Sequence, residues 1–274
     1  MTRRMGLALA LKSEAMRLAR SPLLVLHGAL AGALGGLSGA YFALSPWDSL
    51  LGADAFFQLL GAGAPLLAGI ACALSIDAER EAGGCANLLG VPSRRTALAA
   101  KTLALLALGL ASALVATALF LGILAGAGRE VPGPGAVALA VLGMGAGSGC
   151  VYLAATFFAL RFGRNASIGV GALGFAVALA SLGGLANGLV TGTFSGTLGM
   201  GAALFVPFSW PSRFASLAIE AGIAHAAPGG EAAAGALAGA LGQLGLVCAL
   251  ATLAAGCIAF GCANRLECRP HAEE

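Results

Sequence analysis

Six long apolar stretches with almost no charged side chains set the strongest limit on what this chain can fold into. A membrane-crossing helix needs about 20 mostly apolar residues, and each stretch reaches that length. The predicted spans are Pro22–Leu44, Ala55–Ile76, Thr102–Ala127, Ala136–Leu160, Ala166–Val190 and Ala234–Gly261. Charged residues make up 10% of the 274 residues, against roughly 25% in a soluble domain. We therefore expect an all-α integral membrane protein with one six-helix transmembrane domain, residues 22–261.

Basic residues gather on one side of these spans. Of the 15 Lys and Arg residues, all but Arg129 and Arg213 lie in four segments, which are residues 1–21, 77–101, 161–165 and 262–274. The positive-inside rule places segments rich in Lys and Arg in the cytoplasm. Both termini are therefore expected there, the first as a cytoplasmic arm and the second as a cytoplasmic tail. An even number of spans agrees with this arrangement.

A shorter apolar segment precedes the last span on the outer side. Residues 198–208 are apolar, but Pro207 and Pro211 interrupt a helix at this place. Irregular backbone at membrane depth survives only where protein or a water-filled cavity shields it. We expect residues 191–233 to form an outer segment that is re-entrant or interfacial.

The chain lacks the common signatures of catalysis. It has no GxxxxGK[ST] phosphate loop, no HExxH and no GxSxG, the patterns of P-loop hydrolysis, zinc hydrolysis and acyl transfer. His27 is the exception among predicted spans that hold almost no ionisable residues, and this scarcity argues against a proton-coupled transporter. We expect no catalytic residue and no metal or cofactor bound by this chain.

Two cytoplasmic segments carry the clearest features outside the spans. The arm at residues 1–21 repeats apolar residues at helical spacing between basic ones, which predicts an amphipathic helix on the inner leaflet. The loop at residues 77–101 holds a charged turn, then Leu88 and Leu89, then a Gly-Val-Pro break. Two interpretations of this loop stay open. It is an ordinary solvated connection, or it contains a short helix that presents the two leucines to a soluble partner.

The order of these features resembles that of the ABC-2 type permeases, the membrane subunits of one class of ABC exporter. The resemblance lies in the basic arm, the first two spans and a loop with the pattern Glu79-x-Glu81…Leu88-Leu89-Gly90-x-Pro92-x-Arg94-Arg95…Lys101. Within that class, lantibiotic-protection permeases are similar in Leu11-Lys12-Ser13-Glu14, Arg20-Ser21-Pro22 and the run Pro207–Arg213. The likeness covers nearly the whole chain through short, degenerate motifs.

The resemblance implies a fold of the type V exporter kind and a chain that works with other subunits. The implied partners are a soluble ABC ATPase dimer that binds ATP and Mg²⁺, a second permease chain (identical or paralogous), the lipid bilayer and an amphipathic peptide, with no nucleic acid. The residues implied for ATPase coupling are Glu79, Arg80, Glu81, Leu88, Leu89, Pro92, Arg94 and Arg95. Those implied for the connecting helix are Lys12, Glu14, Arg17 and Arg20, and for the outer segment Pro207, Trp210, Pro211 and Arg213.

The function implied is export of an amphipathic antimicrobial peptide, which protects a bacterial cell against a lantibiotic. The chain would cross the bacterial cytoplasmic membrane several times and leave ATP hydrolysis to its partner. Two alternatives remain: an ABC-2 exporter of another lipid, drug or polysaccharide, and a membrane anchor or sensor that transports nothing. The chain departs from the pattern of that class in being unusually rich in Gly and Ala, so its substrate-facing helices stay unassigned.

Overall fold

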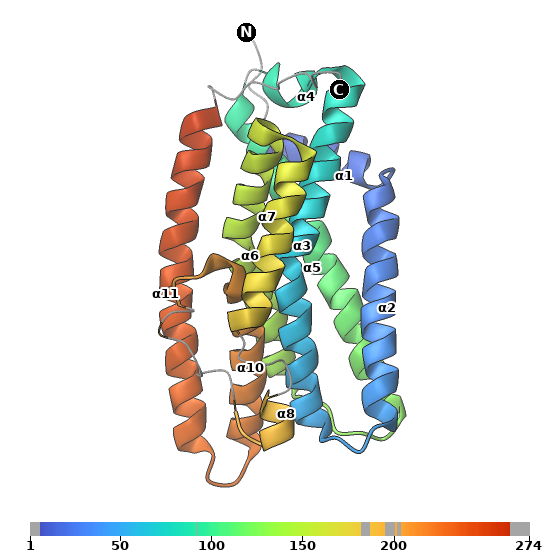
Figure 1. Cartoon of the computed structure of the whole chain (residues 1–274), viewed down its shortest axis with the longest axis vertical. Coiled ribbons are helices and arrows are strands. Elements are labelled where there is room, and N and C mark those ends of the chain that lie inside the picture. The colour runs from blue at the N-terminus through green and yellow to red at the C-terminus, as the bar shows by residue number, and fades with distance from the viewer. Residues whose placement is uncertain (1–5, 92, 182–186, 195–200, 202–203, 264–274) are drawn as a thin grey trace.

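The computed structural model describes residues 6–91, 93–181, 187–194, 201 and 204–263, and these form helices without any strand (Figure 1). The helices are α1 (Leu7–Leu18), α2 (Pro22–Leu44), α3 (Ser49–Gly83), α4 (Ala86–Leu89), α5 (Arg94–Gly126), α6 (Pro134–Phe162), α7 (Arg164–Ser181), α8 (Asn187–Thr191), the 3-10 turn η1 (Pro207–Ser209), α10 (Trp210–Ala226) and α11 (Glu231–Cys262). The long helices run along one axis, and α1 and α4 lie at the same end of the bundle (Figure 1).

Five of these helices, α2, α3, α5, α6 and α11, are long and apolar enough to cross a membrane. This agrees with the prediction of a multi-pass helical membrane protein. The fifth predicted span, Ala166–Val190, is not among them. Its helix α7 has 18 residues, which cover about 27 Å at the usual rise, and residues 182–186 lie outside the described part of the chain. The sixth crossing therefore stays a prediction.

Polar side chains begin the helices, and glycines end or separate them. Ser21, Asp48 and Ser93 precede α2, α3 and α5, and each accepts a hydrogen bond from a backbone N–H two or three residues further on. Gly84 ends α3 with a φ of 59°, a left-handed conformation that glycine adopts without strain. These caps extend α3 and α5 well past their predicted spans.

The connection between α3 and α5 is consequently shorter than predicted. The predicted loop at residues 77–101 reduces to residues 84–93, which include the short helix α4. At 35 residues, α3 is about 52 Å long, against a hydrocarbon core of about 30 Å. The ends of α3 and α5 thus extend beyond the lipid, and α4 lies on them.

The two prolines of the predicted outer segment do not act as predicted. Pro207 and Pro211 do not end a helix, because Pro207 opens η1 and Pro211 lies in the first turn of α10, where a missing N–H costs nothing. The helix α10 is buried among α3, α6 and α11 in the half of the bundle away from α4 (Figure 1). Residues 198–200, 202 and 203 of the predicted apolar patch lie outside the described residues.

Two glycines let α10 approach its neighbours closely. A Cβ atom on Gly61 of α3 would lie 2.4 Å from Cα of Ser212, and one on Gly147 of α6 would lie 2.9 Å from the backbone nitrogen of Pro211. Both distances are shorter than carbon and nitrogen atoms tolerate without bonding. Any larger residue at either position would push α10 out of its place.

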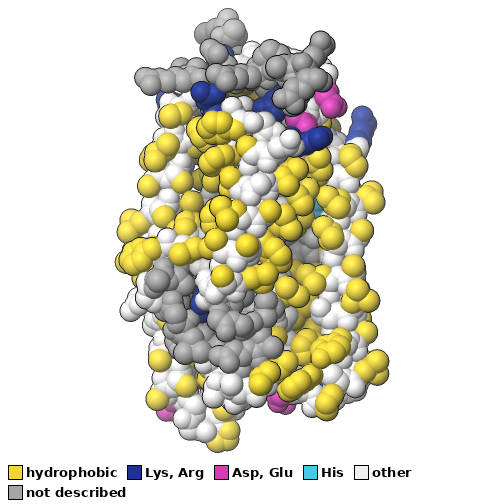
Figure 2. All heavy atoms as spheres, viewed as in Figure 1, with side chains coloured by type: hydrophobic (Ala, Val, Ile, Leu, Met, Phe, Trp, Pro, Cys, Tyr) yellow, Lys and Arg dark blue, Asp and Glu magenta, His cyan; other side chains and the backbone are white. Residues whose placement is uncertain are grey.

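Charged side chains segregate along the bundle. Figure 2 shows apolar side chains over most of the visible flank, with Lys and Arg gathered at the end that carries α1 and α4. The exposed leucines of the spans, such as Leu37, Leu142 and Leu253, face outward. In water such a surface would be costly, whereas lipid solvates it.

Candidate functional site

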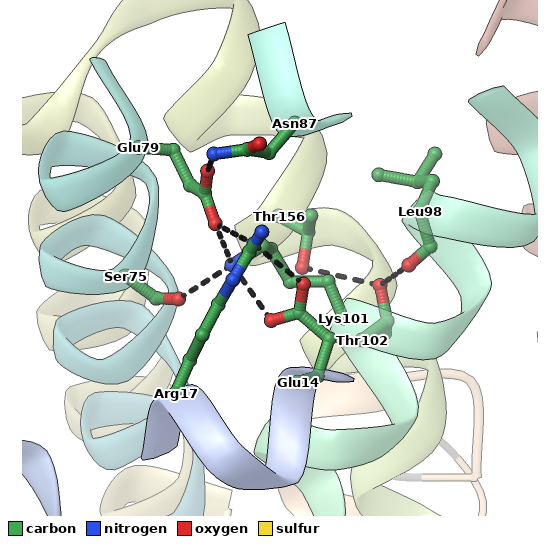
Figure 3. A network of polar contacts seen from close by, with 9 residues as sticks. All are labelled: Glu14, Arg17, Ser75, Glu79, Asn87, Leu98, Lys101, Thr102 and Thr156. Carbon is green, nitrogen blue, oxygen red and sulfur yellow. Dashed lines mark hydrogen bonds and ion pairs between the residues drawn. The ribbon is translucent and has the colours of Figure 1, made fainter. Parts of the chain in front are cut away.

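Four charged side chains form a network that joins α1, α3 and α5 at the α4 end (Figure 3). Arg17 Nη1 lies 3.0 Å from Glu14 Oε1 and 2.5 Å from Glu79 Oε1. Lys101 Nζ lies 3.0 Å from Glu14 Oε2 and 3.0 Å from Glu79 Oε1. Two acids thus face two bases, and the network is electrically balanced.

This network is largely removed from solvent. The side chains of Lys101 and Glu79 are 3% and 6% exposed, whereas that of Arg17 is 39% exposed. Lys101 also donates to Ser75 Oγ at 3.1 Å, and Asn87 Nδ2 of α4 donates to Glu79 Oε2 at 3.4 Å. A buried charge is tolerated when its partners and hydrogen bonds are in place, so the network fixes α1 and α4 onto the two long helices.

The network unites residues that the sequence assigned to separate elements. Glu14 and Arg17 were predicted for the connecting helix and Glu79 for the coupling loop, and here they touch. Lys101 was predicted only as a basic residue at the end of the loop. The sequence feature that could have identified Lys101 is its place directly before an uncharged stretch. A lysine buried at such a place needs an acidic partner.

Arg80 serves a second junction, between α3, α6 and α7. Its Nη2 donates to the carbonyl oxygens of Ala159 at 2.6 Å and Leu160 at 3.0 Å, in the last turns of α6. Asp77 lies 3.3 Å from Arg80 Nη1 and 3.5 Å from Arg164 Nη1. A cation at the carboxyl end of a helix interacts favourably with its dipole. Arg80 is therefore a structural tie in this chain.

Leu88 does not face a partner. The expectation that α4 presents both leucines is wrong for Leu88, which is 1% exposed and packs with Ile76 and Leu98, while Leu89 is partly buried. The physical reason is that α4 folds back onto α3 and α5, so the apolar side of α4 packs against these two helices.

The outward side of this end carries polar and small residues instead. Glu81, Asn87 and Arg95 are exposed, as are Lys12 and Arg20 of the predicted connecting helix, whereas Arg94 is half-buried. Pro92 was also predicted for coupling and lies outside the described residues. The exposed residues on and beside α4 thus include Glu81, Ala86 and Asn87.

A second polar cluster lies between α3 and α10, in the other half of the bundle. Ser216 Oγ donates to Asp54 Oδ1 at 2.7 Å, and Gln58 Nε2 donates to Asp54 Oδ2 at 2.8 Å. The Glu220 carboxyl interacts with Asp54 as well. Asp54 and Glu220 are 2% and 0% exposed, so both acids are enclosed by protein.

This cluster places ionisable residues in the protein interior just outside the predicted spans, where the sequence did not indicate buried charges. Asp54 belongs to the spanning helix α3, and Glu220 and Arg213 lie in the buried helix α10. Enclosed acids are costly and need partners. The argument against an ion-coupled transporter therefore applies to the predicted spans alone.

The remaining residues predicted for the outer segment are buried in α10 and η1. Arg213 is 2% exposed, and its Nη2 donates to the carbonyl oxygen of Ser181 at the end of α7. Trp210 is 1% exposed, and its Nε1 donates to the carbonyl oxygen of Leu204 at 3.0 Å. Both side chains anchor α10 rather than meet a ligand from outside.

The chain matches no family model, no curated protein and no solved structure. Among the described residues, no three His, Cys, Asp or Glu side chains gather as a metal site would require. Function is therefore inferred from the sequence motifs and from the geometry of the α4 end.

Proposed function

We propose that this chain is the membrane-spanning permease subunit of an ABC exporter that works with a separate ATPase. The observation that supports this most is the network of Glu14, Arg17, Glu79 and Lys101 (Figure 3). A soluble motor acts on a membrane domain only through an element outside the lipid that is rigidly joined to several spans. The α4 turn meets that condition.

Force applied at α4 has a continuous path into the bundle. Asn87 of α4 bonds to Glu79 of α3, and Glu79 is paired with Arg17 of α1 and Lys101 of α5. Arg80, next in sequence, bonds the end of α6. Movement of α4 would therefore carry α1, α3, α5 and α6 together, as the coupling element of an ATP-driven exporter requires.

The finer architecture belongs to the same proposal. Six spans with both termini in the cytoplasm, arranged as in type V exporters, would place α7 as the fifth span. The placement of η1 against α7 supports a re-entrant outer segment, because it brings the start of α10 beside a helix that descends from the α4 end (Figure 1). The substrate we propose is an amphipathic antimicrobial peptide, and this rests on the sequence motifs.

The ATPase partner is tested by charge reversal at the end of α3 beside α4. We expect the tagged chain, purified in mild detergent, to retain a soluble P-loop ATPase that mass spectrometry identifies. The variant Glu81→Lys should lower its recovery about tenfold, which corresponds to about 1.4 kcal/mol. Glu81 is exposed and outside the ion network, so the fold should persist.

The matched control is Glu130→Lys, the same reversal on an exposed residue at the opposite end of α5. It should retain the ATPase as well as the original chain does. A chain that purifies alone would favour the anchor or sensor function, and equal losses in both variants would contradict docking at α4.

Topology gives a separate prediction. A fluorescent protein fused after residue 274 should fluoresce, because it folds in the cytoplasm, and alkaline phosphatase inserted between α5 and α6 should be active outside. One observation makes this test necessary. Cys85, beside α4, is disulfide-bonded, and because such bonds normally form outside the cytosol, it argues for the opposite orientation. A dark fusion with an inactive phosphatase would place the α4 end outside and overturn ATPase docking there.

A further inference from the structure

An apolar cavity of about 620 Å³ lies within the membrane-spanning part of the bundle. Its walls come from α2, α3, α5 and α6, with one residue of α7. Leu, Ile, Ala and Gly make up most of the lining, and no Lys, Arg, Asp, Glu or His contributes to it. The cavity is therefore distinct from both polar clusters.

The cavity exists because α2 packs closely against α5 and much less against α3. A Cβ on Gly35 of α2 would lie 2.3 Å from the carbonyl oxygen of Ala116, and one on Gly39 would lie 3.1 Å from Ile123. These close approaches hold α2 against α5. On the facing side of α3, a Cβ on Gly63 would meet no atom within 4 Å, so space remains between α2 and α3.

Two of the four hydroxyl side chains in the lining are hydrogen-bonded to backbone carbonyl oxygens. Ser112 Oγ donates to the carbonyl oxygen of His27 at 3.1 Å, and Ser148 Oγ to that of Met144 at 2.8 Å. A polar ligand would lose its water at this depth and find few groups to replace it. The lining thus suits a ligand without charge along most of its length.

We propose that the cavity binds one acyl chain of a membrane lipid, which enters sideways between α2 and α3. The cavity volume lies in the usual range for ligand pockets. If the cavity stayed empty, the side chains that line it would lose dispersion contacts. A helix of a second copy does not fit. Because a helix is about 10 Å wide, about five of its residues would already fill this volume. The inference does not depend on an ATPase partner.

The test uses the full chain in nanodiscs that contain a phosphatidylcholine with a diazirine at the middle of one acyl chain. After irradiation, mass spectrometry of peptides should find adducts on the cavity-lining Leu67 and Leu110. Adducts on Leu114 and Leu119, which are exposed on α5, serve as an internal standard for ordinary lipid contact. If only those exposed residues are labelled in the original chain, the proposal is overturned.

A filled cavity gives the second arm. Gly63→Phe should lower labelling of Leu110 about tenfold relative to Leu119, because a phenyl ring occupies the space. Gly122→Phe is the matched control, since Gly122 lies on α5, is exposed and has open space around its Cβ position. It should leave labelling of Leu110 unchanged. Undiminished labelling of Leu110 in a folded Gly63→Phe chain would also overturn the proposal.

Discussion

Lys101→Met should lower the free energy of unfolding by about 3–5 kcal/mol, the cost of removing one partner from a buried ion pair. The change leaves Glu14 and Glu79 facing a single guanidinium, that of Arg17. Both carboxylates are mostly buried, so water compensates little. We expect α1 to detach first, because among the described residues Arg17 with Glu79 would be its one remaining ion pair to α3 or α5.

Unfolding of the purified chain by sodium dodecyl sulfate, followed by circular dichroism, measures this effect. Lys12→Met on the exposed side of α1 is the control and should stay within about 0.5 kcal/mol. The double variant Lys101→Met with Glu79→Gln restores charge balance and should recover part of the loss. Equal stability of the two single variants would show that the network contributes nothing.

Gly61→Ala is expected to destabilise the chain by about 1–3 kcal/mol, the usual cost of overpacking a core. The added methyl group would lie 2.4 Å from Cα of Ser212, a backbone atom that no side-chain rotation removes. The helix α10 would have to shift, and its contacts with Asp54 and Gln58 would shift with it.

Gly63→Ala provides the comparison, two residues along the same helix. Its methyl group would meet nothing within 4 Å, so the better helix propensity of alanine should raise the free energy of unfolding by up to about 1 kcal/mol. The same detergent titration measures both variants. Effects of equal sign would contradict the close packing of α3 on α10.

The helical membrane character of the chain was predictable because it rests on long-range composition. An uncharged stretch of 20 residues has few alternatives to a membrane helix. The buried acids were not predictable in the same way. Asp54 precedes the predicted second span by one residue, and Glu220 lies in the predicted outer segment, where a charge ordinarily indicates water.

The candidate site shows a similar limit. Sequence motifs selected Glu14, Arg17 and Glu79, but their meeting depends on contacts such as Arg17 with Glu79, which lie 62 residues apart. Leu88 shows the converse. A leucine between charged residues in a short connection suits both an exposed contact and a buried seal, and only the fold-back of α4 decides between them.

The two glycine contacts of α10 also determine which parts of the bundle are able to move. Held by Gly61 on one side and Gly147 on the other, α10 has no clearance to slide against α3 or α6. We therefore expect these three helices to move together as one unit. The apolar windows of α2 and α11 are only 28% and 17% buried, so we expect an opening motion to displace α2 and α11 relative to the unit of α3, α6 and α10.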